Sequence, residues 1–89
     1  SLPYVVERKY IPDFVLSNGV IIEVKGYWTS ADRTKHLKVR KAHPDLDIRF
    51  CFMNAHNKLN KRSKTTYAQW CEKRGFKWCQ RNIPKDWIL

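Results

Sequence analysis

The sequence predicts a single α/β domain, residues 1–89, in which a small mixed sheet is flanked by two helices. A hairpin pattern at residues 11–25 and an alternation of apolar and polar residues at 46–53 indicate strands. Capping-box patterns at residues 29–32 and 66–69 each indicate the start of a helix. A domain of 89 residues buries a modest core, so we expect a partner chain, a metal or a nucleic acid to add to its stability.

The clearest element is a hairpin formed by residues 11–16 and 20–25, which follows a short strand expected at residues 4–7. A two-residue Asn18-Gly19 turn would pair Phe14 with Glu23 and would mix apolar and charged residues on both faces. A three-residue loop that begins at Ser17, with Gly19 in the left-handed conformation, pairs Phe14 with Ile22. We predict the second register because it places five apolar side chains on one face, which a slip of one residue would destroy. These side chains are Phe14, Leu16, Val20, Ile22 and Val24.

The same register places two carboxylates opposite each other, those of Asp13 and Glu23, with Lys25 two residues along the same face. Like charges that face each other destabilise a sheet unless a proton or a cation neutralises them. Magnesium takes one or two carboxylates and keeps several waters, and a backbone carbonyl such as that of Val24 could complete its shell. Taken singly, Glu23 and Lys25 are ordinary polar-face residues. The three charged side chains together favour a metal site.

The rest of the chain alternates helices and strands. A first helix is predicted from the capping box at 29–32 to about His43, before Pro44. Residues 46–53 are predicted as a strand with one buried face, and residues 54–64 as a basic loop. A second helix begins at Thr66 and ends at Gly75. Residues 76–79 are expected to form a last strand, and residues 87–89 are expected to dock on the core.

The formal charge of +10 on 89 residues favours a polyanionic partner, and nucleic acid is the commonest one. The basic residues cluster in the first helix and in the loop at 54–64, where they are expected to contact the phosphate backbone rather than bases. Trp28 is the one tryptophan beside the carboxylates that could stack on a base. The candidate contacts are Arg33, Lys35, His36, Lys38, Arg40, Lys58, Lys61, Arg62 and Lys64.

The three cysteines, Cys51, Cys71 and Cys79, suit neither a disulfide framework nor a zinc site, because their number is odd and no CxxC pair occurs. Buried free thiols in a reducing compartment are expected, which favours a cytoplasmic location. No apolar run is long enough to span a bilayer, so no membrane partner is expected. RRM, KH, recognition-helix and zinc-finger signatures are also absent.

Pro12-Asp13, followed after nine residues by Glu23-Val24-Lys25, matches the PD-(D/E)xK nuclease motif, which by itself is short and weakly specific. A longer series of residues, spread over nearly the whole chain, is similar to the endonuclease I family of T-odd phages, which are Holliday-junction resolvases. The series is Tyr10-Ile11-Pro12-Asp13-Phe14, Asn18-Gly19, Glu23-Val24-Lys25-Gly26, Trp28, Asp32-Arg33, Lys35-His36-Leu37, His43-Pro44, Leu46-Asp47-Ile48-Arg49, Cys71-Glu72-Lys73, Ile83-Pro84 and Trp87-Ile88.

The resemblance implies a restriction-endonuclease-like (PD-(D/E)xK) core and a phosphodiesterase that depends on Mg²⁺ or Mn²⁺. Asp13 and Glu23 would hold the metal, and Lys25 would position water and stabilise developing charge. The family carries a further catalytic glutamate on an N-terminal helix, supplied by the other subunit of a strand-swapped dimer. Glu7 falls in the bridging segment by position and is not assigned that role. The chain is therefore expected to lack the family's N-terminal helix, either as a fragment or as a shorter relative with a different third acid.

The leading hypothesis is therefore a structure-selective DNA endonuclease that acts as a homodimer. A sequence-specific endonuclease on the same scaffold, such as a homing or mismatch-nicking enzyme, is the first alternative. A DNA-binding fragment without catalysis is the second, and an RNA-binding protein is a more distant one.

Overall fold

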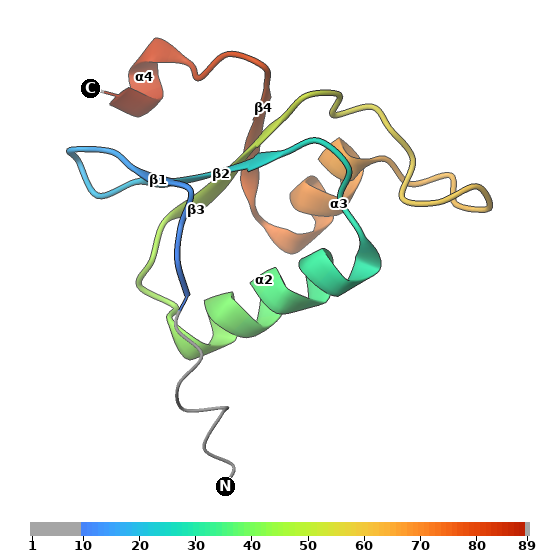
Figure 1. Ribbon diagram of the computed structural model, residues 1–89, viewed down its shortest axis with the longest axis horizontal. Helices are drawn as coiled ribbons and strands as arrows, with labels where there is room; N and C mark the ends of the chain where they lie inside the picture. The colour runs from blue at the N-terminus through green and yellow to red at the C-terminus, as the bar shows by residue number, and fades with distance from the viewer. Residues whose placement is uncertain (1–9, 89) are drawn as a thin grey trace, which may run out of the picture.

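The structure is a computed structural model that describes residues 10–88 and contains one four-stranded mixed sheet, in the order β1-β2-β3-β4 (Figure 1). β1 (Phe14–Val15) pairs antiparallel with β2 (Ile21–Lys25), and β3 (Ile48–Phe52) and β4 (Lys77–Gln80) follow in parallel. The α/β class and the mixed sheet are confirmed. The strand predicted at residues 4–7 lies outside the described residues.

Two helices, α2 (Ser30–Ala42) and α3 (Tyr67–Arg74), connect the three parallel strands (Figure 1). Both connections advance along the sheet in the same direction, and right-handed crossovers then place both helices on the same face. The core on that face centres on Trp28, which packs against Phe50, Phe52 and Trp70. The two helices that were predicted to flank the sheet therefore lie on one and the same face. The short helix α4 (Lys85–Ile88) covers the other face with Trp87.

The two helix starts are where the capping patterns predict them. Thr29 caps α2 by accepting a hydrogen bond from the backbone N–H of Asp32 at 3.1 Å. Thr66 and Gln69 form a reciprocal capping box at the start of α3. α3 ends at Gly75, whose φ of 79° is the left-handed conformation that glycine adopts without steric cost.

The hairpin has the predicted three-residue loop and the predicted register. The backbone N–H of Leu16 donates to the carbonyl of Val20 at 2.8 Å, Phe14 lies opposite Ile22, and Gly19 has a φ of 89°. The apolar face continues into a second core cluster that contains Val20, Ile22, Cys51, Cys79 and Trp87. Phe14 and Val24, at the open end of the hairpin, remain exposed.

β3 differs from its prediction, because both of its faces are covered rather than one. Cys51 is 3% exposed, although its side chain lies on the face opposite Phe50 and Phe52. β3 lies between two parallel neighbours, with α2 and α3 on one face and α4 on the other. Central strands of parallel sheets are buried on both faces in this way.

The C-terminal segment docks on the core as predicted, through Trp87. The ring of Trp87 is buried, and the guanidinium of Arg49 lies 5.1 Å from its centroid. The backbone carbonyl of Trp87 accepts a hydrogen bond from Nδ2 of Asn18 at 2.7 Å. Ile88 is half exposed. Of the helices in residues 10–88, none has the length and apolar character that crossing a bilayer requires.

Candidate active site

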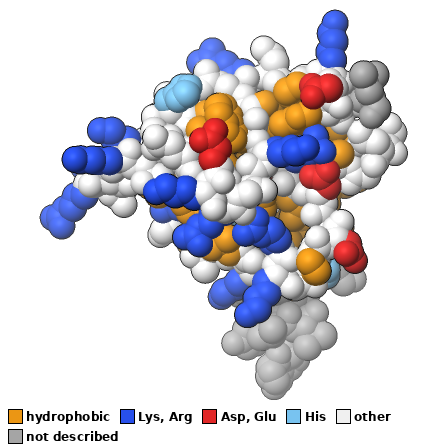
Figure 2. All heavy atoms as spheres, turned by 180° about the vertical axis from the view of Figure 1, so that it is seen from behind, with side chains coloured by type: hydrophobic (Ala, Val, Ile, Leu, Met, Phe, Trp, Pro, Cys, Tyr) orange, Lys and Arg blue, Asp and Glu red, His pale blue; other side chains and the backbone are white. Residues whose placement is uncertain are grey.

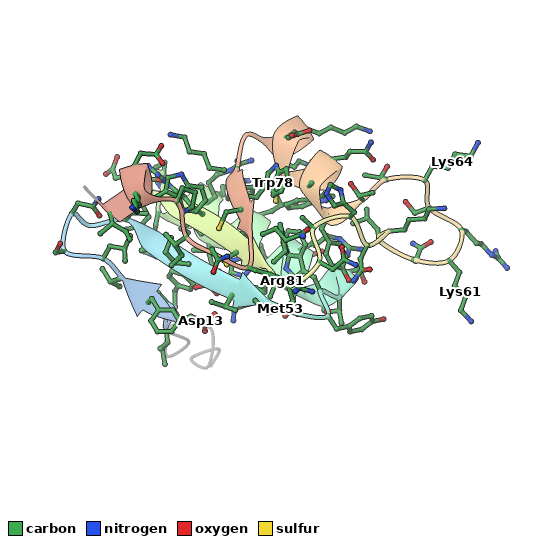
Figure 3. The ribbon with its side chains drawn as sticks, turned by 90° about the horizontal axis from the view of Figure 1, so that it is seen from above. Asp13, Met53, Lys61, Lys64, Trp78 and Arg81 are labelled. Carbon is green, nitrogen blue, oxygen red and sulfur yellow. The ribbon has the colours of Figure 1, made fainter. Side chains whose placement is uncertain are left out.

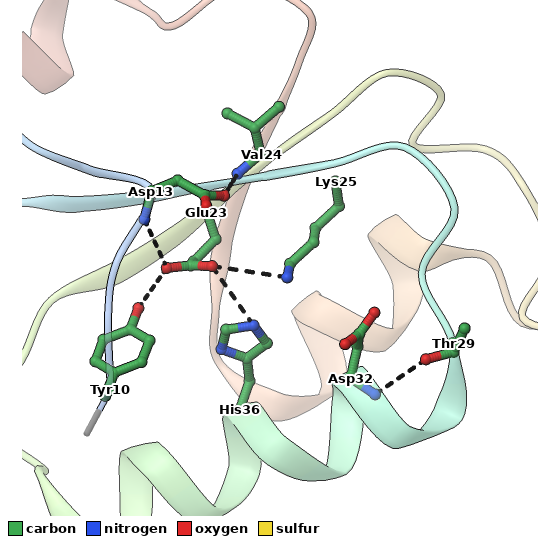
Figure 4. A network of polar contacts seen from close by, with 8 residues as sticks. All are labelled: Tyr10, Asp13, Glu23, Val24, Lys25, Thr29, Asp32 and His36. Carbon is green, nitrogen blue, oxygen red and sulfur yellow. Dashed lines mark hydrogen bonds and ion pairs between the residues drawn. The ribbon is translucent and has the colours of Figure 1, made fainter. Parts of the chain in front are cut away.

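The hairpin register brings Asp13 next to Glu23, whose carboxylate points from β2 toward helix α2 (Figure 4). Glu23 is 4% exposed, which is unusual for a carboxylate. Its Oε2 atom accepts hydrogen bonds from the hydroxyl of Tyr10 at 2.6 Å and from the backbone N–H of Asp13 at 3.3 Å. These donors offset part of the cost of burying the group.

The other oxygen of Glu23 faces two nitrogen atoms. Oε1 lies 3.6 Å from Nζ of Lys25 and 3.7 Å from Nε2 of His36 (Figure 4). Lys25 reaches the carboxylate because residues two apart on a strand share a face. The sequence predicted the placement of Glu23 and Lys25, and the structure brings both to the same point as Asp13.

Asp13 is exposed, and its Oδ2 atom accepts a hydrogen bond from the backbone N–H of Val24 at 2.9 Å. The N–H and C=O of one strand residue point to the same side of the strand. The carbonyl of Val24 is therefore directed toward the edge at which Asp13 lies, beyond the two residue pairs that join β1 to β2. This direction is consistent with the predicted role of the Val24 carbonyl.

Two groups around Glu23 have shifted ionisation. Burial, followed by the hydrogen bond to Glu23, raises the pKa of Tyr10, so its hydroxyl remains a donor. Burial, and then the charges of Lys25 and Lys35, lower the pKa of His36 to about 4. The imidazole is therefore neutral near pH 7, and its contact with Glu23 is not an ion pair at that pH.

The donor set suits a hard divalent cation. Asp13 and Glu23 supply carboxylate oxygens from adjacent positions, and Mg²⁺ requires only one or two carboxylates because it retains several waters. Within residues 10–88, no group of three or more His, Cys, Asp or Glu side chains is arranged to hold a metal. A soft-metal or zinc site of that kind is accordingly not found in the described part of the chain.

Three of the predicted DNA contacts are buried or half-buried in the structure. His36 is fully buried, and Arg33 is 9% exposed, with its guanidinium donating to the carbonyl of Trp28 at 2.9 Å. Arg40 is half-buried, with its guanidinium 4.2 Å from the ring centroid of Phe76, and it donates to the carbonyl of Arg74. Trp28 is completely buried in the core and has no face for a base.

The other six candidates are exposed. Lys35 and Lys38 lie on α2, and Lys61 and Lys64 project from the loop away from the body of the molecule (Figure 3). Lys58 and Arg62 belong to the same loop. Figure 2 shows Lys and Arg side chains on the protruding loop and over the lower half of that face. Two of these exposed cations therefore lie on the helix that carries His36, and the other four lie in the loop.

Tyr10 and His36 were not assigned to the metal site from the sequence, although both reach Glu23. Tyr10 precedes the hairpin and belongs to no periodic pattern. Only its place in the family motif at residues 10–14 could have indicated that it belongs to the site. His36 could have been found from its spacing, since Arg33, His36 and Leu37 follow the i, i+3, i+4 pattern of one helix face.

The sequence profile of the family described as phage endonuclease I matches residues 1–89. The protein named "Endonuclease I" from Escherichia phage T7 is 48% identical over 91 residues, which cover 99% of this chain and 61% of that relative. "Endodeoxyribonuclease 1" from Enterobacteria phage T3 is 49% identical over 86 residues, which cover 93% of this chain and 57% of the relative. The chain thus spans about three fifths of the length of these two relatives. Because the family profile matches the chain from end to end, the chain belongs to the phage endonuclease I family.

Proposed function

We propose that this chain is the metal-binding part of a DNA endonuclease that hydrolyses phosphodiester bonds, with a preference for branched DNA such as a Holliday junction. The observation that carries the proposal is the meeting of Asp13, Glu23 and Lys25 at one point of the sheet. The names of the T7 and T3 relatives, "Endonuclease I" and "Endodeoxyribonuclease 1", support an endonuclease that acts on DNA. We assign the fold to the restriction-endonuclease-like core on the same grounds.

Asp13, Glu23 and the carbonyl of Val24 would hold Mg²⁺ or Mn²⁺. When bound, the ion would lower the pKa of a coordinated water and polarise the scissile phosphate. Tyr10 and the backbone of Asp13 hold one oxygen of Glu23 in place. Lys25, whose side chain is 15% exposed, is close enough to the carboxylates to orient water and to stabilise negative charge on the phosphate.

The DNA would lie across the exposed cations of α2 and the loop. Lys35 and Lys38 line the same pocket as Tyr10, whose hydroxyl donates to Glu23, so they are close to the site. The loop cations extend the surface away from it (Figure 3). Contacts of this kind position DNA by its phosphates and its shape, which suits a structure-selective enzyme.

The homodimer, including the strand-swapped form, and the cytoplasmic location of a phage enzyme in its host are further parts of this proposal. Exposed apolar residues on and beside the edge strand β1 offer a surface for a second copy: Ile11, Phe14 and Val15. The three free thiols, all buried, are consistent with a reducing compartment.

The test is cleavage of a four-way junction and of a linear duplex with the same sequences, each in Mg²⁺, Mn²⁺ or EDTA. We expect cutting of the junction that depends on metal and is lost in EDTA. Glu23→Ala should reduce cleavage by about a hundredfold or more while junction binding survives, because the metal ligand is removed and the basic surface is not. The matched control is Glu72→Ala, since Glu72 is an exposed carboxylate on α3 that bonds Trp78 instead.

Each other outcome replaces part of the proposal. Equal or greater cutting of particular duplex sequences would identify a sequence-specific enzyme. Binding without cleavage in either metal would identify a non-catalytic DNA-binding chain, and cleavage of RNA alone would overturn the assignment to DNA. A Glu23→Ala variant that cuts at the normal rate would show that the metal site lies elsewhere.

A further inference from the structure

His36 lies in the middle of α2, with its side chain completely buried beneath Glu23. Its ring packs edge-on against Phe50, with centroids 5.0 Å apart, and edge-on against Tyr10, at 6.3 Å. Among the described residues, neither ring nitrogen has a hydrogen-bond partner. A buried polar atom without a partner costs about 1–3 kcal/mol, so an apolar residue would suit this position better if packing were its only purpose.

The unpartnered nitrogen points at the candidate metal ligand. Nε2 lies 3.7 Å from Oε1 of Glu23, whereas an N–H···O hydrogen bond spans about 2.7–3.2 Å. A small rotation of the imidazole or of the carboxylate would close this gap. The hydrogen bond would then satisfy Nε2 and give Oε1 a fixed donor from a rigid helix.

Lys25 explains why a second donor is useful at Oε1. In the structure Lys25 shares Oε1 with His36, at 3.6 Å, while Oε2 is held by Tyr10 and Asp13. The proposed function requires the lysine to serve water and the scissile phosphate. When its ammonium turns away from Glu23, His36 is the remaining described side chain next to Oε1.

We propose that His36 is a positioning residue, which donates from Nε2 to Oε1 of Glu23 and fixes the orientation of this carboxylate toward a divalent cation. The inference rests on the proposed function, because it takes Glu23 as a metal ligand. Groups that orient metal ligands in this way typically change metal affinity by about 10–100-fold when they are lost.

The experiment compares His36→Met with His36→Gln, two side chains of similar length of which only Gln carries a donor. Mn²⁺ is titrated into the full chain without DNA and followed by calorimetry, and thermal unfolding is measured in EDTA. We expect His36→Met to weaken Mn²⁺ binding by about tenfold or more. The metal-free Met variant should be at least as stable as the Gln variant, because it buries no unpartnered polar atom.

His36→Gln should restore Mn²⁺ affinity close to that of the unaltered chain, and the Mn²⁺ concentration for half-maximal cleavage should follow the same order. If His36 is only a core residue, both variants will bind Mn²⁺ like the unaltered chain, and the proposal fails. His36→Asn replaces the Met variant if that variant does not fold, because its shorter amide does not reach the place of Nε2. The control His56→Met alters an exposed histidine outside the site and should change nothing.

Glu23→Ala separates the two levels of the argument. If this variant loses Mn²⁺ binding while His36→Met retains it, the metal site stands and the role of His36 is wrong. If Glu23→Ala binds Mn²⁺ normally, the proposed metal site itself is wrong.

Discussion

Glu23 owes its place in the interior to the donors that surround it. Tyr10 and the backbone of Asp13 bind one oxygen, while Lys25 and His36 face the other. A buried carboxylate without such partners would cost several kcal/mol. The groups around this carboxylate come from the segment before β1, from β2 and from α2, so its surroundings depend on three separate parts of the fold.

At the same scale, the thiol of Cys71 should link stability to alkaline pH. The side chain is fully buried, and burial, followed by the charge of Glu72, raises the pKa of this thiol to about 12 from a usual value of 9.0. Between these values the unfolded chain loses the proton and the folded chain keeps it, so stability falls as the pH rises above 9. At pH 10 the loss should be about 1.4 kcal/mol relative to pH 7.

Urea unfolding of the unaltered chain and of Cys71→Ala at pH 7 and pH 10 measures this effect as a difference. The Ala variant should be less stable at pH 7 but should lose less on going to pH 10. The same pH dependence in both proteins would show that the thiol is not responsible.

The sequence could identify Asp13, Glu23 and Lys25 because a two-residue period and one turn determine their placement. Arg33 and His36 were predicted on the DNA surface because a cation on a helix was expected to be exposed, whereas both side chains are buried. In α2 the inward positions include polar residues, whose nitrogen atoms find the carbonyl of Trp28 or approach Glu23. These partners precede the helix, in β2 and in the turn before α2, and helical spacing alone does not identify them.

At the scale of elements, the glycine that ends α3 should contribute more to stability than a glycine in an ordinary conformation. An alanine Cβ would meet no backbone atom within 4 Å at either Gly75 or Gly26, and Gly75 alone of the two has a positive φ. Gly75→Ala should therefore cost about 1–2 kcal/mol, from the strain of the left-handed conformation.

Gly26→Ala is the matched control and should lie within about 0.5 kcal/mol of the unaltered chain. Guanidinium unfolding monitored by far-ultraviolet circular dichroism compares the two. Similar losses in both variants would mean that backbone conformation does not determine the effect.

The sequence predicted elements that depend on local chemistry better than it predicted their layering. Capping residues determine where α2 and α3 begin, and the apolar face of the hairpin selects its register. The placement of both helices on one face follows from the order of the strands in the sheet, and no local sequence pattern predicts that order. For the same reason β3 was predicted to have one buried face, although helices cover both of its faces.

For the whole molecule, a charge of +10 should make DNA binding strongly dependent on salt. Six candidate contacts are exposed on α2 and the loop, and six neutralised phosphates correspond to a slope of about −5 in log K against log salt concentration. Replacing Lys61 and Arg62 by Gln should make this slope shallower by about 2.

The control with the same change in charge is the double variant Lys77→Gln and Lys85→Gln. Lys77 lies opposite Arg49 on the face of the sheet that α4 covers, and Lys85 lies on α4 itself. Fluorescence anisotropy with a labelled junction at several salt concentrations gives both slopes. If the control makes the slope as shallow as the loop variant does, DNA also contacts the face of the sheet that α4 covers.

The hydrogen bond from Asn18 to the carbonyl of Trp87 joins the turn of the hairpin to a residue 69 positions later in the chain. During synthesis on the ribosome, residues 10–25 emerge long before α4 does, and they cannot acquire this anchor until Trp87 has left the exit tunnel. The parallel partner β3 and the covering helix also arrive after the hairpin, so its two carboxylates are made early but brought into their final arrangement late.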